Sequence, residues 1–202
     1  MLVKSEHFVR LVSAYEMFFY SYAEWLHAVT NGTESLYTVP KEFLTNEIRL
    51  AGVFRDGFSL ETIPVKLRTV ELCTVAVNNF GRALDSVPDN LKSPELCLTA
   101  VKNNAYSLHF VPDDIKTYEM CLIALNSSGV FDAVPTRFYT PILLANAVKS
   151  FLPVNKVPIE YQTEEFWLEL YSSGTVDMSQ IPEEHCDYIA TNSILTKACR
   201  TP

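Results

Sequence analysis

The chain has 202 residues, of which 48% are hydrophobic and 20% are charged, a composition typical of a globular protein and not of a disordered one. Its 16 basic and 24 acidic side chains give a formal net charge of -8, which disfavours binding to the phosphates of nucleic acids. The content of only 6 glycines disfavours glycine-rich phosphate loops and turn-dense β folds, so that an all-α fold is favoured.

The first segment, residues 1–21, is rich in apolar residues but is interrupted by charges at Lys4, Glu6 and Arg10. These charges disfavour a secretory signal, so we expect the segment to cap the fold at its N-terminal end. A membrane-spanning helix needs about 20 nearly uncharged residues, and the most hydrophobic window, residues 9–29, contains several charges. We therefore expect no contact with a membrane and a cytoplasmic location, or delivery into the cytosol of a host.

Residues 22–186 are organised by a proline that recurs every 23 or 24 residues. The seven prolines are Pro40, Pro64, Pro88, Pro112, Pro135, Pro158 and Pro182. Each follows a valine or isoleucine, and each has an apolar residue four places earlier. Such a fixed period predicts a repeat architecture, here of about seven units.

A residue that can cap a helix stands five places after each proline. The seven are Thr45, Thr69, Ser93, Thr117, Thr140, Thr163 and Asp187. Their side-chain oxygens can accept hydrogen bonds from the free N–H groups of a first helical turn, so a long helix is predicted after each one. We expect these helices to end at a left-handed glycine, and two short helical turns to meet at each proline. The predicted glycine stops are Gly32, Gly57, Gly81, Gly129 and Gly174.

One unit of this kind cannot bury its apolar face alone, so successive copies must stack. We therefore predict an all-α fold, an elongated α-solenoid of about seven helical repeats of 23–24 residues with capping helices at both ends. Within a single domain of residues 1–202, the boundaries are an N-terminal cap at 1–21, repeats at 22–186 and a C-terminal cap at 187–202, whose helix spans 187–199.

The five cysteines are predicted to be free thiols, and no metal or other cofactor is expected. Cys73, Cys97 and Cys121 occupy one repeat position, which would place them about 10 Å apart on neighbouring helices, beyond the reach of a disulfide. Cys186 and Cys199 do not have the spacing of a zinc site.

The central units, residues 69–140, resemble short helical repeats of a family catalogued only as a domain of unknown function. The stretch ELCLTAVKNNAYSLHFVPDDIKT carries the resemblance through its acidic-aliphatic helix start, its Ala-Val pair, its Asn-containing turn and its later leucine. Members of that family occur in bacterial effector-like proteins and in proteins of large viruses. The resemblance implies a helical-repeat fold and a binding role, and it implies no catalytic residues.

The sequence contains no nucleophile, metal or nucleotide motif, so we predict a non-enzymatic module that binds another protein. An effector, or a phage or viral inhibitor of a host protein, is the setting implied by the resemblance. Two alternatives stay open: a small enzyme or toxin with a site in the degenerate N-terminal or fifth repeat, and an acidic mimic of nucleic acid. The identity of the partner and the oligomeric state are not specified by the sequence.

The candidate partner-binding residues lie in the turns that follow the long helices, where the units differ from one another. They are Phe80, Arg82, Lys102, Asn104, Tyr106 and Phe151. Because the repeated apolar positions are committed to packing, we expect these variable positions to form one binding edge, with aromatic residues and arginine as its anchors.

Overall fold

A computed structural model describes residues 20–128 and 130–198 of the chain. These residues form helices and turns and contain no strand, so the all-α prediction is confirmed for the described part of the chain. The predicted N-terminal cap, except for its last two residues, and the predicted glycine stop at Gly129 lie outside the described residues.

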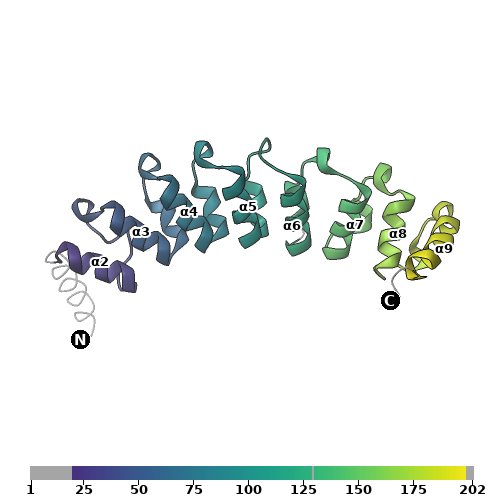
Figure 1. Cartoon of the computed structure of the whole chain (residues 1–202), viewed down its shortest axis with the longest axis horizontal. Coiled ribbons are helices and arrows are strands. Elements are labelled where there is room, and N and C mark those ends of the chain that lie inside the picture. Colours follow the sequence, from purple (N-terminus) through teal and green to yellow (C-terminus); the bar gives the residue numbers. More distant parts are fainter. Residues whose placement is uncertain (1–19, 129, 199–202) are drawn as a thin grey trace, which may run out of the picture. The chain divides into compact units, whose positions relative to one another are not determined.

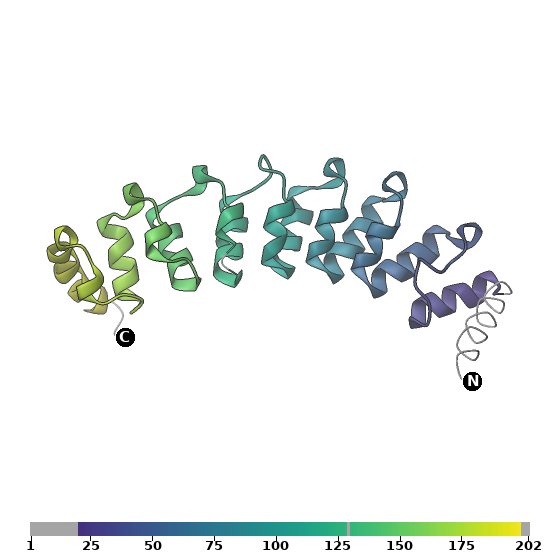
Figure 2. The same ribbon diagram turned by 180° about the vertical axis from the view of Figure 1, so that it is seen from behind.

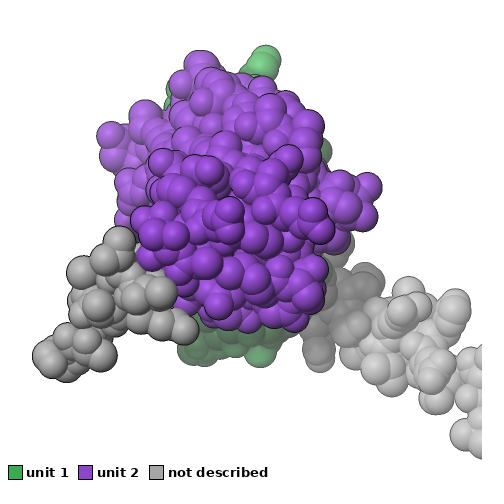
Figure 3. Space-filling view, turned by 90° about the vertical axis from the view of Figure 1, so that its right-hand side faces the viewer, with its two compact units in different colours: residues 1–91 green, residues 92–202 purple. Residues whose placement is uncertain are grey.

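The chain divides into two compact units (Figure 3). Unit 1 comprises residues 1–91 and unit 2 comprises residues 92–202. The single domain expected over residues 1–202 stays a prediction, and each unit is described here by itself.

The described residues of unit 1 form three long helices. The long helices are α2 (Tyr22–Asn31), α3 (Asn46–Arg55) and α4 (Val70–Asn79). A 3-10 helix stands on either side of the repeat proline after α3 and after α4, whereas α2 is followed by a 3-10 helix only after Pro40. The short ones are η1 (Lys41–Phe43), η2 (Gly57–Thr62), η3 (Val65–Leu67), η4 (Gly81–Ser86) and η5 (Asp89–Leu91). Helix α3 packs against both α2 and α4, and η2 packs against α3, α4 and η4 (Figure 1).

Unit 2 continues the same pattern through five long helices. They are α5 (Pro94–Asn103), α6 (Tyr118–Ser128), α7 (Pro141–Ser150), α8 (Glu164–Ser172) and α9 (Glu183–Ala198). The short helices are η6 (Ala105–Phe110), η7 (Phe131–Ala133), η8 (Thr136–Phe138), η9 (Val154–Lys156), η10 (Ile159–Tyr161) and η11 (Met178–Gln180). Each long helix packs against the next one in sequence, as the solenoid prediction requires within a unit (Figure 2).

The long helices begin where the sequence predicts. The hydroxyl oxygens of Thr45, Thr69, Ser93, Thr117, Thr140 and Thr163 each accept a hydrogen bond from the backbone N–H three residues later. Ser21 caps α2 in the same way and forms a reciprocal capping box with Glu24. Pro94 and Pro141 are the first residues of their helices, where a missing N–H costs nothing. Six of the seven predicted caps are therefore confirmed.

The seventh predicted cap, Asp187, was wrong. Helix α9 begins at Glu183, so Asp187 lies one turn inside it, and the closing helix spans Glu183–Ala198. The backbone N–H of His185 donates to the carbonyl of Pro182 at 2.9 Å, and Glu183 and Glu184 occupy the first turn of α9. The turn that follows the proline therefore continues directly into the long helix, and no separate cap is needed.

The predicted glycine stops have two different roles. Gly32 and Gly174 follow α2 and α8 with φ of 73° and 74°, as left-handed helix ends require. The prediction was wrong for Gly57 and Gly81, which begin the 3-10 helices η2 and η4 without a positive φ. A Cβ atom at Gly57 would lie 2.6 Å from the carbonyl oxygen of Ala76, so glycine lets η2 approach the backbone of α4.

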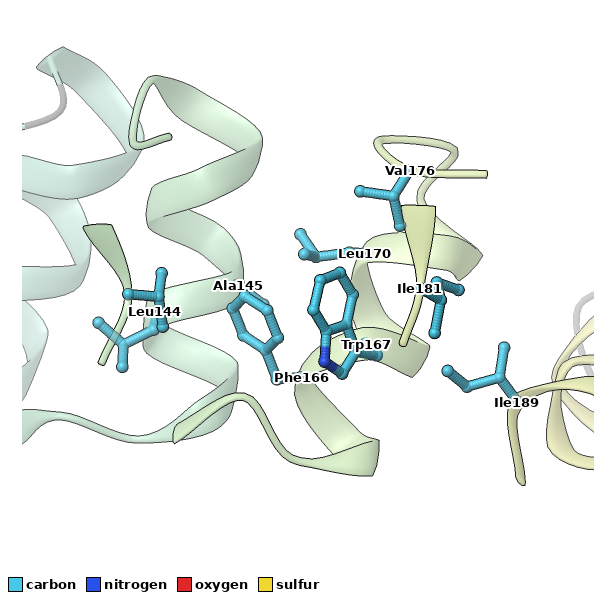
Figure 4. Packing of buried hydrophobic residues seen from close by; sticks show 9 residues of the cluster. Leu144, Ala145, Phe166, Trp167, Leu170, Val176, Ile181 and Ile189 are labelled. Carbon is cyan, nitrogen blue, oxygen red and sulfur yellow. The ribbon is translucent and has the colours of Figure 1, made fainter. Parts of the chain in front are cut away.

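The core of each unit is built from the repeated apolar positions. The residue before every repeat proline is buried, as Val39, Ile63, Val87, Val111, Val134, Val157 and Ile181 show. Near the C-terminal end of unit 2, Phe166 and Leu170 of α8 lie between Leu144 of α7 and Ile189 of α9 (Figure 4). Close packing of these side chains, at about 25 cal/mol per Å² of apolar surface removed from water, supplies the main stabilisation.

The residue directly before each helix cap, which we call the clamp position, often ties one repeat to the next. The Arg68 guanidinium donates to the carbonyl of Ser86. Lys92 Nζ donates to the carbonyl of Phe110 at 2.9 Å, and Lys116 Nζ donates to the carbonyl of Ala133 at 2.9 Å. Each acceptor lies two residues before the proline of the following repeat.

Candidate partner-binding surfaces

In unit 1, exposed aromatic side chains gather where α3 ends and η2 begins. Phe54 is 72% exposed and Phe58 is 49% exposed. The ring centroid of Phe58 lies 4.0 Å from that of Phe80, which directly follows α4 and is half-buried. The end of α3 is also tied to the end of α4, because Asn79 Nδ2 donates to the carbonyl of Phe54 at 2.5 Å. Phe80 therefore belongs to a wider group, the aromatic cluster of Phe54, Phe58 and Phe80.

Arg82 is exposed on η4, six residues before its repeat proline. The same repeat position holds Phe58 on η2 and Tyr106 on η6, which are exposed as well. The position is therefore exposed in these three repeats, and its chemistry differs among them.

In unit 2, Tyr106 is part of a network that links two repeats. Its ring centroid lies 4.3 Å from the imidazole of His109, and its backbone N–H donates to Asn104 Oδ1 at 3.0 Å. His109 Nε2 lies 3.0 Å from Asp132 Oδ2, and the hydrogen bond from His109 lowers the pKa of Asp132. Asn104 caps η6 and orients Tyr106, so these two predicted residues do come together.

The two remaining predicted residues are Lys102 and Phe151. Lys102 Nζ lies 3.7 Å from Glu119 Oε1, and both side chains are more than half exposed. Phe151 directly follows α7 and is 69% exposed. Phe80 and Arg82 belong to unit 1 and the other four residues to unit 2, so the single binding edge expected from the sequence stays a prediction.

Sequence analysis missed Phe54, Phe58, His109 and Asp132. Position within the repeat could have indicated the last two residues, because His109 and Asp132 both stand three residues before a repeat proline. Tyr37 and Glu61 share that position, and the Tyr37 hydroxyl donates to Glu61 Oε1 at 3.4 Å. Polar pairs at this position therefore cross from one repeat to the next.

The described residues show little that resembles a reaction centre. Cys73, Cys97 and Cys121 are free and fully buried, and burial raises the pKa of the Cys97 thiol to about 11. A thiol with a raised pKa is a poor nucleophile at neutral pH.

Within residues 20–128 and 130–198, no group of three or more histidine, cysteine or acidic side chains could hold a metal ion. In the same part of the chain, no helix is both long enough and apolar enough to cross a membrane.

The comparison with family models agrees with the resemblance found in the central units. Residues 69–116 match the model of a domain of unknown function (DUF4116). The DUF4116 segment spans two full repeats and holds five of the six predicted site residues, Phe151 being outside it. No curated protein and no solved structure matches the chain.

Proposed function

We propose that this chain is a non-enzymatic protein–protein interaction module and that the aromatic cluster of unit 1 is one of its binding surfaces. The observation that carries the proposal is the exposure of Phe54 and Phe58 beside Phe80, in a unit whose residues before the repeat prolines are buried. Large apolar side chains left in water at adjoining helix ends are typical of a surface that is covered in a complex.

The cluster is also well suited to bind with little loss of conformational freedom. Phe58 already rests against Phe80, and the end of α3 is fixed by the hydrogen bond from Asn79 to the carbonyl of Phe54. Aromatic side chains have few rotatable bonds, and pre-ordered ones lose less entropy when a partner covers them. Such rings are common anchors at the centre of interfaces.

Exposed charged side chains flank this cluster in sequence: Arg55 and Arg82 are basic, and three others are acidic. Asp56 precedes η2, Glu61 lies on η2 and Asp85 lies on η4. In a chain of net charge -8, these carboxylates favour a partner with an apolar patch bordered by basic residues. The charges would speed association chiefly at low salt, while the rings would determine how slowly the complex dissociates.

The biological setting follows from the resemblance of the central units and is part of the same proposal. The chain acts in the cytoplasm, or in the cytosol of a host cell into which it is delivered. There it works as an effector, or as a phage or viral inhibitor, by covering a functional surface of a host protein.

The experiment compares the unaltered chain with two variants in affinity capture followed by quantitative mass spectrometry. In the test variant, Phe54→Ser and Phe58→Ser remove the exposed rings of the aromatic cluster. The control is Tyr37→Ser, because Tyr37 is 73% exposed and stands outside the cluster. We expect one partner to be retained in stoichiometric amount by the unaltered chain and the control, and at least tenfold less by the test variant.

Thermal unfolding of all three proteins is measured alongside, so that loss of the partner is separated from loss of the fold. Equal retention of the partner by the test variant would remove the aromatic cluster from the interface. Failure of the unaltered chain to retain any partner, combined with turnover of a substrate, would overturn the interaction module in favour of an enzyme.

A further inference from the structure

Unit 1 contains a cavity of about 370 Å³ that is separate from the aromatic cluster. Its apolar wall is formed by Leu36, Leu44, Ile63, Pro64 and Leu67. The volume lies within the range of about 300–1,000 Å³ that is common for ligand pockets. Leu67 is 43% exposed, so an occupant would cover apolar surface that water now touches.

Beside this cavity, the first repeat lacks the clamp found in the next three repeats. Leu44 stands at the clamp position that Arg68 holds in the second repeat. By the same register, the acceptor would be the carbonyl of Thr62, which lies two residues before Pro64 and lines the cavity. Leucine has no donor, and among the described residues no side chain donates to that carbonyl.

The charges that line the cavity are both positive. Lys41 and Arg49 contribute to its wall, and no acidic residue does. Within the described residues, neither the Lys41 ammonium nor the Arg49 guanidinium is in a hydrogen bond or an ion pair. Two cations that line one cavity without an acidic neighbour favour an anionic occupant.

We infer that this cavity binds the carboxyl-terminal residue of another polypeptide, one that ends in an aliphatic side chain. The aliphatic side chain fills the wall formed by Leu36, Leu44 and Leu67. The terminal carboxylate pairs with Lys41 and Arg49, and a backbone N–H of the bound end donates to the carbonyl of Thr62. The terminal residue thus supplies the donor that Leu44 cannot supply.

The three features of the cavity distinguish this occupant from simpler ones. A fatty acid has the apolar body and the carboxylate but no N–H for the Thr62 carbonyl. An internal peptide segment has the N–H and the side chain but no terminal carboxylate for Lys41 and Arg49. Capture of a chain terminus through its free charge and backbone groups is an established mode of peptide recognition.

The test measures fluorescence anisotropy with a labelled hexapeptide, Gly-Ser-Gly-Ser-Ala-Leu, titrated with the full chain. We expect the peptide with a free carboxylate to bind and its carboxyl-terminal amide to bind at least about tenfold more weakly, because the amide has no charge for the two cations. Decanoate, the fatty-acid probe, should compete at least several-fold less well than the unlabelled peptide.

Substitutions in the chain give the second arm of the test. Leu44→Arg restores the donor of the clamp position and should fill the cavity, so that peptide binding is lost while the melting temperature stays the same or rises. Arg49→Gln should weaken binding about tenfold. Lys66→Gln is the matched control, because Lys66 is an exposed cation on η3 that does not line the cavity, and it should bind like the unaltered chain.

Equal affinity for the acid and the amide, or undiminished binding by the folded Leu44→Arg variant, would overturn the inference. Failure of the peptide to bind would do the same. Equal binding of decanoate would replace the peptide terminus by a fatty acid as the occupant. None of these outcomes depends on the aromatic cluster, which the capture experiment tests with other variants.

Discussion

The first two repeats of unit 1 differ at the clamp position, as well as in how their long helices end at Gly32 and Asp56. In the second repeat, Arg68 donates to the carbonyls of Ile63, Glu61 and Ser86, which joins three stretches of backbone. In the first repeat, Leu44 cannot donate, and a cavity remains beside the carbonyl of Thr62. One repeat position can therefore either tie neighbouring repeats together or leave space for a ligand.

The remaining repeats have other side chains at the clamp position. Lys92 and Lys116 reach the next repeat as Arg68 does. Gln162 Nε2 donates only within its own repeat, to the carbonyl of Val157 at 2.9 Å. Tyr139 packs instead against neighbouring rings, with its centroid 5.3 Å from that of Phe131. The comparison shows that the repeat forms with apolar, cationic, amide or aromatic side chains at this position.

The largest loss of stability is expected from substitutions in the core, and its size should differ between the first and fourth repeats. Leu108 is fully buried, and Leu108→Ala should cost about 2–5 kcal/mol of unfolding free energy because it leaves an enclosed cavity. Leu36 occupies the same repeat position but already lines the cavity of unit 1, so Leu36→Ala should cost less. Urea denaturation of both variants measures the difference. An equal or larger cost for Leu36→Ala would show that the first repeat is as tightly packed as the fourth.

The second-largest loss of stability is expected from a substitution at the clamp position. The Lys116 side chain is only 8% exposed, and Lys116→Met should leave the carbonyl of Ala133 without its donor. Loss of a buried partner of this kind costs about 1–3 kcal/mol. Leu44→Met is the matched control and should change stability by less than about 1.5 kcal/mol, since it keeps an apolar side chain of similar volume. A stability of Lys116→Met equal to that of the unaltered chain would show that the hydrogen bond to Ala133 contributes nothing.

Most of the fold could be predicted because the repeat is determined by local sequence signals. The proline spacing, the cap residues and the apolar positions each depend on one helix and its first turn, and Thr69 and Leu84 behave as the pattern predicts. The start of α9 was not predicted, because the turn after Pro182 continues into the long helix, whereas the turns after the other repeat prolines end before a cap. Gly57 was misinterpreted because its role depends on the nearby backbone of Ala76.

The candidate site was predictable only in part. Exposure of Tyr106 and Phe151 followed from their departure from the repeat consensus. The clamp position was missed because a cation before a helix cap has the appearance of an ordinary solvated residue. Only the geometry of the following repeat shows that Lys116 reaches the carbonyl of Ala133 and that Leu44 leaves a cavity.

A smaller loss of stability, similar in different repeats, is expected when a helix cap is removed. Thr117 and Thr45 accept hydrogen bonds from the third residue of their helices at 3.3 and 3.4 Å. Thr117→Ala should cost about 1 kcal/mol through loss of the cap, and Thr45→Ala should cost a similar amount. Thermal unfolding of both variants tests whether the difference between repeats is confined to the clamp position. An unchanged melting curve for Thr117→Ala would show that its hydroxyl is not needed to start α6.

The smallest effect is expected from the outward pair of His109 and Asp132 in unit 2. The Asp132 side chain is 79% exposed, so solvent screens the pair, and Asp132→Asn should cost at most about 1 kcal/mol. Because the hydrogen bond from His109 lowers the pKa of Asp132 in the folded state, its stabilisation is complete above the ordinary pKa of aspartate, near 3.8.

That stabilisation should disappear as the pH falls through the lowered pKa and Asp132 takes up its proton. The melting temperatures of the unaltered chain and of Asp132→Asn should therefore differ at neutral pH and converge in acid. Glu61→Gln is the counterpart in unit 1, where Tyr37 donates at 3.4 Å, and its effect at neutral pH should be smaller still. A difference for Asp132→Asn that grows as the pH falls below 3.8 would reverse the predicted sign and would show that the charged carboxylate of Asp132 destabilises unit 2.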